Sequence, residues 1–180
     1  ADGGLPLPEV VLRACMAYFN AANVATTAYP FLSIGAANLI KSFAGADLRE
    51  RFLPAMLAGR FSGTMALTEA GQGSALGDLR TSARPTADGS YRVFGQKMFI
   101  SGGDHELTEN IVHMVLARIE GAPAGTKGIS LFLVPKWLVN PDGSLGPRND
   151  VALAGLLHKM GHRNTTSTVL SFGERDGAVG

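Results

Sequence analysis

Hydroxyl and glycine residues gather in one stretch of the sequence, residues 61–103, and their types could hold a ligand. Thr68 closes a run with β character at 61–68, and Ser101 closes another at 91–101. A hydroxyl both donates and accepts, so a pair of them matches a ligand edge that mixes carbonyls and ring nitrogens. The stretch therefore predicts a seat for a flat, polar-edged ligand, with a plain turn as the alternative. The loop between the two runs is rich in small residues: Gly71, Gly73, Ser74 and Gly77.

The glycines of this loop, at positions 71, 73 and 77, are also similar in spacing to a dinucleotide-binding fingerprint. That fingerprint needs a helix directly after it, so that the pyrophosphate of the ligand meets the helix N-terminus. Residues 78–85 instead have β character and contain a proline. A nicotinamide-binding fold is therefore not predicted.

Four other polar residues have spacings or positions worth weighing. His158 and His162 are four apart, as metal ligands on a helix would be, but Gly161 separates them within a β pattern. With no third ligand evident, no metal site is predicted. Asp104 and His105 follow the second strand end, where they either line the mouth of a binding site or belong to a solvated turn.

The elements that must position these residues change character at residue 61. Residues 8–59 have helical spacing, with a break expected near 28–30 because the residue before a proline disfavours the helix. Two further helices are expected at 31–43 and 47–58, whereas residues 139–150 are expected to form a surface loop. Short β-rich runs separated by turns predict an antiparallel sheet or barrel, and so an α+β fold. The runs are 61–68, 80–86, 91–101 (which a turn at Gly95 could split), 110–119, 128–135, 151–157 and 166–173.

Composition excludes several classes of function. The 180 residues carry 16 Lys and Arg against 15 Asp and Glu, with no basic run, so no nucleic-acid partner is predicted. The apolar runs, such as 129–134, are far shorter than the roughly 20 residues that span a bilayer, so no membrane span is predicted. The single cysteine suits a reducing, cytoplasmic location. Since the chain lacks a starting Met, it is expected to be a fragment. Lys97 is expected to face water from its strand.

Four segments, in this order, carry a resemblance to a known family. They are MALTEAGQGSALGDL from residue 65, GQKMFISGG from 95, GISLFLVPK from 128 and HKMGHRNTTSTVLSF from 158. The sequence is similar to acyl-CoA dehydrogenases over nearly its whole length. Its helical part most resembles the large bacterial branch that includes long-chain acyl-CoA and 3-methylmercaptopropionyl-CoA (methylthiopropanoyl-CoA) dehydrogenases.

The resemblance implies a fold, a cofactor and a set of site residues. Residues 1–60 would be part of a helical N-terminal domain, and 61–180 a middle β domain, barrel-like and incomplete at its C-terminal end. FAD would lie between this domain and a C-terminal helical bundle. Ser74 would also lie near the CoA part of the substrate. The flavin-contacting residues would be Met65, Leu67, Thr68, Gly73 and Ser74 in the first segment and Phe99, Ile100 and Ser101 in the second.

The implied reaction is the α,β-desaturation of acyl-CoA thioesters, with hydride transfer to FAD N5. The partners would be acyl-CoA, an electron-transfer flavoprotein or similar acceptor, and copies of the full-length enzyme in a homo-oligomer. The motif that carries the family's catalytic base is absent here, and no catalytic residue is named. Two alternatives stay open: a same-scaffold oxidase acting on another substrate, or a non-enzymatic flavin- or acyl-CoA-binding module. The sequence departs from the family at Ala70 (commonly Pro), Ala75 (commonly Asp) and Phe99 (often Trp).

Overall fold

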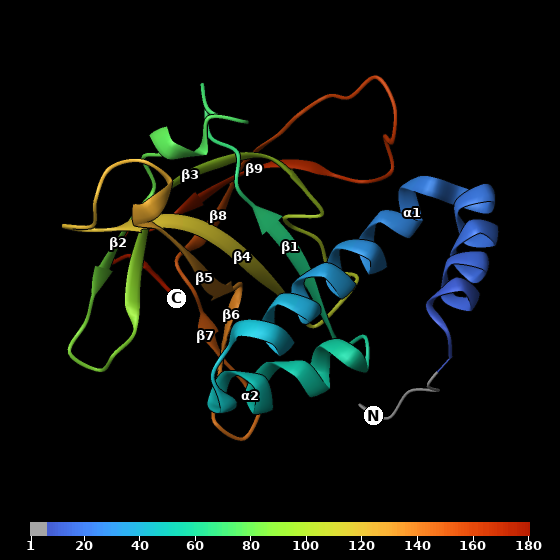
Figure 1. Ribbon diagram of the computed structural model, residues 1–180, viewed down its shortest axis with the longest axis horizontal. Helices are drawn as coiled ribbons and strands as arrows, with labels where there is room; N and C mark the ends of the chain where they lie inside the picture. Colours follow the sequence, from blue (N-terminus) through green and yellow to red (C-terminus); the bar gives the residue numbers. More distant parts are fainter. Residues whose placement is uncertain (1–6) are drawn as a thin grey trace.

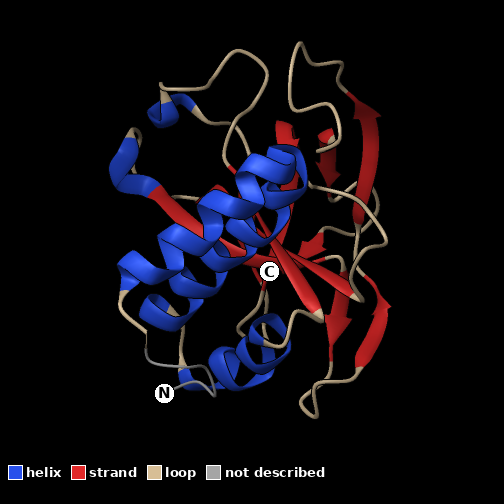
Figure 2. Ribbon diagram, turned by 90° about the vertical axis from the view of Figure 1, so that its right-hand side faces the viewer, coloured by secondary structure: helices blue, strands red, loops and turns tan. Residues whose placement is uncertain are grey.

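The computed structural model describes residues 7–180, in which two helices precede a curled β-sheet (Figure 1). Turned by 90°, the helices gather on one side and most strands on the other (Figure 2). This arrangement confirms the predicted α+β fold. The elements, in chain order, are α1 Glu9–Phe43, α2 Ala46–Leu57, β1 Phe61–Ala66, η1 Leu76–Asp78, β2 Ser82–Pro85, β3 Tyr91–Ser101, β4 Asn110–Ile119, η2 Thr126–Gly128, β5 Ile129–Pro135, β6 Trp137–Val139, β7 Leu145–Arg148, β8 Val151–Leu156, β9 Ser167–Phe172 and β10 Ala178–Val179.

Helix α1 bends at Asn23, whose backbone is not helical (φ −161°, ψ 94°). Oδ1 of Asn23 accepts the N–H of Thr26 at 3.0 Å and so caps the segment that follows. Pro30 lies inside the helix, so the break predicted at 28–30 is wrong. The bend lies instead at Asn23, upstream of the proline. Tyr29, next to Pro30, makes an edge-on contact with His105, with 5.1 Å between ring centres.

The main sheet has the strand order β1-β4-β2-β3-β9-β8, with β5 paired to β4 and β10 paired to β3. Pairing is antiparallel as predicted, except that β4 lies parallel to both β1 and β2. Strand β3 is not split at Gly95 but changes partner there, from β2 to β9. A Cβ on Gly95 would lie 2.6 Å from Oγ1 of Thr81, so only glycine allows this crossing.

Two apolar clusters meet at strand β4, which is buried on both faces. Val112 and Met114 face the helices, whereas Val115 and Ala117 face the inside of the curled sheet, the period-2 alternation of a strand. The helix-side cluster includes Ala36, Ala37, Ile40, Phe52, Ala55, Met56, Phe61 and Val139. The sheet-side cluster includes Ala66, Ala83, Val93, Ile100, Phe132, Val134, Val151, Leu170, Phe172 and Ala178.

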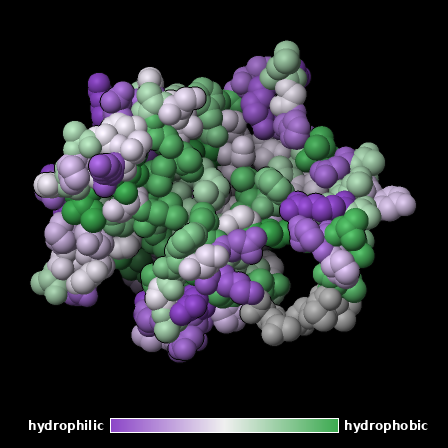
Figure 3. All heavy atoms as spheres, in the orientation of Figure 1, coloured by the Kyte–Doolittle hydropathy of each residue, from purple (hydrophilic) through white to green (hydrophobic). Residues whose placement is uncertain are grey.

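One predicted loop is wrong: within residues 139–150, β7 pairs with β6 as a two-stranded hairpin. Ser144 bonds Asp142 and Asn140, which closes the turn between them, so the polar residues serve the hairpin turn and not a long loop. On the face shown in Figure 3, apolar residues gather over the middle of the molecule and polar ones at its margins. Between residues 7 and 180, none of the helices has the length and hydropathy to cross a bilayer.

Candidate functional site

The two predicted strand ends lie side by side. The backbone carbonyl of Thr68, just after β1, accepts the N–H of Met98 in β3 at 2.9 Å. The side chains of Thr68 and Ser101 are half-buried. Among residues 7–180, neither hydroxyl has a hydrogen-bond partner from the protein. The two hydroxyls are thus held at the ends of strands and remain free to bond a ligand.

A β-bulge between Lys97 and Ile100 changes the direction of the side chains in β3. Phe99 within it has a φ of 60°, which is uncommon for a residue with a bulky side chain. Lys97 and Ile100 both point inward, while the Phe99 ring is 61% exposed. The bulge therefore presents an aromatic ring at the surface beside the two strand ends.

The glycine-rich loop starts with a tight turn. Glu69 and Gln72 exchange backbone hydrogen bonds of 2.9 and 3.1 Å around Gly71, whose φ of 85° suits glycine. Beyond it, Gly73 and Ser74 are exposed, and within residues 7–180 their N–H groups have no protein acceptor. Ala75 stands at the N-cap of η1 without a side-chain cap, so the missing family Asp leaves this position uncapped.

A buried ion pair lies beneath this loop. Nζ of Lys97 donates to Glu69 at 2.8 Å and to the carbonyl of Leu67 at 3.0 Å. Lys97 is 0% exposed and Glu69 6% exposed, so the prediction that Lys97 faces water is wrong. Strand alternation could have found it, because Val93, which lies on the inner face, precedes Lys97 by an even number of residues.

Glu69 also accepts hydrogen bonds from the N–H groups of Arg80, at 2.7 Å, and Thr81, at 3.0 Å, and from the Thr81 hydroxyl. Burial acts to raise the pKa of Glu69, but the hydrogen bonds from Lys97, Thr81 and Arg80 together hold it below its usual value. For Lys97, burial lowers the pKa against the opposing pull of Glu69. The carboxylate is therefore held ionised, with its oxygens occupied.

The remaining predicted contacts lie around these groups. Met65 is half-buried and packs against the helix-side cluster, and the Leu67 carbonyl is occupied by Lys97. The side chain of Ile100 is in the sheet-side cluster, and its carbonyl accepts the Thr168 hydroxyl at 2.9 Å. The side chains of Met65 and Ile100 thus pack beneath the site, while Thr68, Ser101 and Phe99 reach its surface. Unpartnered hydroxyls, free loop N–H groups and an exposed ring fit a flat ligand with a polar edge and a phosphate.

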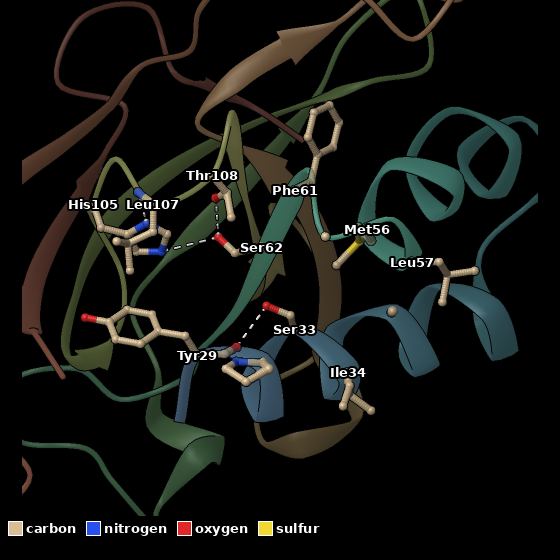
Figure 4. Close-up of a pocket in the computed structure, with 13 residues that line it drawn as sticks. Tyr29, Ser33, Ile34, Met56, Leu57, Phe61, Ser62, His105, Leu107 and Thr108 are labelled. Carbon is tan, nitrogen blue, oxygen red and sulfur yellow. Dashed lines mark hydrogen bonds between the residues drawn. The ribbon is translucent and has the colours of Figure 1, made fainter. Parts of the chain in front are cut away.

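A separate pocket of about 370 Å³ lies at the other end of β1, between α1, the end of α2 and residues 105–108 (Figure 4). Sequence reasoning did not locate it, because its walls come from segments far apart in the chain. Ser62 bonds Thr108 at 3.0 Å and His105 at 3.3 Å within it. Its other lining residues are Tyr29, Pro30, Ser33, Ile34, Ala37, Met56, Leu57, Gly59, Phe61 and Leu107.

His105 lines this pocket instead of standing in a solvated turn. Its Nδ1 accepts the N–H of Leu107 at 3.2 Å, so a neutral ring carries its proton on Nε2 and donates to Ser62. Burial and the nearby charge of Lys136 lower the pKa of His105. Since its Nε2 is a donor, His105 is not the base of a Ser–His pair.

Three carboxylates around the two ends of β1 are each paired with a cation. Glu69 pairs with Lys97, Asp104 with Lys136 and Glu109 with Arg60. Within residues 7–180, no group of three or more His, Cys, Asp or Glu could hold a metal ion.

Comparisons with known proteins give the family. The family model described as "Acyl-CoA dehydrogenase, middle domain" matches residues 64–174. The chain is 42% identical over 179 residues to a 3-methylmercaptopropionyl-CoA dehydrogenase of Ruegeria pomeroyi, covering 99% of this chain and 30% of the relative. It is 47% identical over 150 residues to a butyryl-CoA dehydrogenase of Syntrophomonas wolfei, covering 83% of this chain and 25% of the relative.

A solved structure agrees over the whole chain. An acyl-CoA dehydrogenase of Bacillus anthracis, complexed with FAD, matches with a TM-score of 0.76 and 25% identity, covering 99% of this chain and 28% of that one. The chain thus spans between 25% and 30% of the length of these two curated relatives. With its middle-domain match covering most of the sequence, this chain belongs to the acyl-CoA dehydrogenase family.

Proposed function

We propose that the chain is the part of an FAD-dependent acyl-CoA dehydrogenase that holds the flavin ring and contacts the thioester substrate. The observation that carries this is the hydrogen bond from Met98 to Thr68, which fixes two strand ends whose hydroxyls have no protein partner. Residues 1–60 then belong to the helical N-terminal domain and residues 61–180 to the middle β domain. The end of α2 at Leu57 and the start of β1 at Phe61 support that boundary.

In this proposal the free hydroxyls bond the polar edge of the isoalloxazine. Thr68 and Ser101 serve as donors and acceptors, and the exposed Phe99 ring packs against the flat ligand. The exposed backbone of Gly73 and Ser74 binds the pyrophosphate, with Ser74 also contacting the CoA portion. Met65, Leu67 and Ile100 contribute backbone and apolar contacts from below.

FAD, when bound, supplies the acceptor for the hydride that leaves the β-carbon of the thioester. The chain's own residues orient that acceptor and exclude water from one side of it. The carboxylate that takes the α-proton is proposed to lie outside residues 1–180, because the motif that carries it in the family does not occur in this sequence. An electron-transfer flavoprotein or similar acceptor would reoxidise the enzyme, which would act as a cytoplasmic homo-oligomer.

The test is the visible absorption of the protein expressed from the full reading frame, before and after adding saturated acyl-CoA thioesters of graded length. A flavin band that bleaches with one range of chain lengths supports the proposal. A protein that neither retains nor takes up FAD contradicts it. Bound FAD that no thioester bleaches would instead favour the binding module, and bleaching by a different substrate with oxygen uptake would favour the oxidase.

The site residues are tested separately by Thr68→Ala and Ser101→Ala. Each substitution removes one hydroxyl and is expected to weaken FAD binding by about 1 kcal/mol, or roughly fivefold in Kd. Ser144→Ala, in the exposed turn of the β6–β7 hairpin, is the control and leaves FAD binding unchanged. Unchanged affinity in both site variants would contradict the assignment of these hydroxyls.

A further inference from the structure

The buried Glu69–Lys97 pair has no role in the reaction as described, yet it lies directly beneath the proposed flavin site. Removing two charges from water is costly, and a pair of apolar side chains of similar size is often as stable in such a place. The fold alone therefore does not explain why an ion pair lies here. A requirement for fixed geometry does, because each atom of the pair has a defined partner.

The pair ties together three segments of the chain. Lys97 holds the carbonyl of Leu67 at 3.0 Å and the carboxylate of Glu69 at 2.8 Å. Glu69 in turn holds the N–H groups of Arg80 and Thr81, which follow the glycine-rich loop. The end of β1, the far end of the loop and the middle of β3 are thus joined at one buried point.

Two of the proposed flavin contacts, Thr68 and Phe99, lie next to anchored residues. Thr68 stands between Leu67 and Glu69, both held by Lys97, and its own carbonyl is bonded to Met98. The bulge that turns Phe99 outward begins directly after Lys97. Thr68 therefore has a fixed backbone although its hydroxyl makes no bond within the described chain.

We propose that the Glu69–Lys97 pair is a positioning device, which sets the spacing between the Thr68 and Phe99–Ser101 strand ends and so determines how tightly FAD is held. This inference rests on the proposed function. Neither residue touches the cofactor in this account; both act through the backbone that they anchor. The pair also closes the glycine-rich loop, so the device orders the apoprotein before any ligand arrives.

The test is Lys97→Met in the protein from the full reading frame. The substitution removes the ammonium, keeps all but one atom of the side-chain length and leaves Glu69 its bonds from Thr81 and Arg80. FAD binding, measured by flavin fluorescence quenching, is expected to weaken at least tenfold, and the visible circular dichroism of bound flavin is expected to change. Lys97→Arg, which keeps the charge, is expected to restore most of the affinity. Arg60→Met removes the cation of an exposed pair before β1 and is the matched control, with unchanged affinity.

A second readout needs no cofactor. In the apoprotein, amide hydrogen exchange at Arg80, Thr81 and Met98 is expected to be faster in Lys97→Met than in the wild type or in Arg60→Met. If wild-type protein does not bind FAD, the proposed function fails, and this exchange measurement alone decides whether the pair orders the loop.

Should Lys97→Met fail to fold, Glu69→Gln/Lys97→Met replaces it, because the double variant leaves no unpaired buried charge. The proposal predicts that this variant also binds FAD at least tenfold more weakly. FAD affinity within twofold of the wild type in either folded variant, or unchanged amide exchange at all three positions, would overturn the proposal while leaving the proposed function intact.

Discussion

The two ends of strand β1 treat charged and polar groups in opposite ways. Before the strand, Arg60 and Glu109 pair at the surface, and Ser62 bonds His105 and Thr108 within the pocket. After the strand, an ion pair is buried, and the hydroxyl of Thr68 has no partner within residues 7–180. At the start of β1 the polar groups bond one another. At its end the charged pair is buried, and the Thr68 hydroxyl remains free to bond a ligand.

The difference shows which hydroxyls can still bond a ligand. A hydroxyl that is bonded within the protein offers little to a ligand, because the new bond must replace an old one. Leaving Thr68 and Ser101 unbonded requires that other groups fix the backbone around them. The buried Glu69–Lys97 pair supplies that constraint at the end of β1 that leads into the glycine-rich loop (the loop end). At the end that lines the pocket (the pocket end), the polar groups bond one another and need no such pair.

The largest expected effect comes from removing the carboxylate of the ion pair at each end of β1 and comparing the two losses of stability. Glu69→Ala leaves the ammonium of Lys97 buried without a counter-charge and is expected to destabilise the protein by about 3–5 kcal/mol. Glu109→Ala removes the partner of a solvent-exposed arginine and is expected to cause no measurable loss. Urea unfolding of the two variants at pH 7 gives the free energies of unfolding.

The pH dependence of the Glu69→Ala loss identifies its cause. An unpaired buried Lys97 prefers its neutral form, so the folded variant binds fewer protons than the unfolded chain. Its stability then rises with pH, and the loss shrinks in alkaline solution. A loss that is equal at pH 7 and pH 9.5, or equal in the Glu109→Ala control, would contradict a buried charge as the source.

Acid adds a further test, because His113 of β4, which pairs with the middle of β1, titrates differently from Glu69 at the end of β1. His113 is fully buried beside Thr64, with 2.7 Å between its Nδ1 and Oγ1 of Thr64, and burial lowers its pKa to about 3. Between pH 6.5 and about 3 the unfolded chain binds a proton at this residue and the folded protein does not. Stability is therefore expected to fall by about 1.4 kcal/mol for each pH unit of acidification in this window.

The lowered pKa of Glu69 affects stability only at a lower pH than that at which the titration of His113 begins. Its contribution is present above the usual carboxyl pKa and is lost only as the pH falls through the lower folded value. Unfolding free energies measured at half-unit steps from pH 7 to pH 4 separate the two groups. His113→Gln is expected to flatten the slope, and His162→Gln, at the surface, to retain it. An unchanged slope in His113→Gln would contradict the assignment.

The sequence was sufficient to predict the strand ends at the loop end of β1, but not the pocket at its other end. Thr68, Ser101 and the turn at Gly71 are local features, so periodicity and glycine positions predicted the strand ends, and the resemblance supplied the ligand. The pocket joins Tyr29, Ser62 and His105, which only the packing of α1 on β1 brings together. No local pattern encodes such a contact.

The errors have the same origin. Lys97 is charged, and charged residues usually face water, but its strand position and the distant Glu69 overrule that preference. A proline usually ends a helix, but here the chain bends at Asn23, which caps the segment that runs through Pro30. Side-chain type predicts burial on average, whereas a single partner elsewhere in the chain decides the particular case.

The smallest expected effect concerns the turn that opens the loop. Ala70 is the second residue of the Glu69–Gln72 turn, a position that favours proline, and no hydrogen bond of its N–H appears among residues 7–180. Ala70→Pro is therefore expected to stabilise the protein by about 0.4–1 kcal/mol, chiefly by restricting the unfolded chain. Urea unfolding gives the change in stability, and flavin fluorescence quenching gives the FAD affinity.

Ala87→Pro is the matched control, because Ala87 holds the same position in the turn that Gly89 closes onto Thr86 at 3.2 Å. Both prolines are expected to raise stability by similar amounts, since both act on the unfolded chain. Only Ala70→Pro restricts the loop beside Thr68, so it alone is expected to tighten FAD binding, by up to a few fold. Equal effects of the two prolines on FAD would mean that the loop is already fully ordered by Glu69, and that the loop end owes its binding capacity to the ion pair alone.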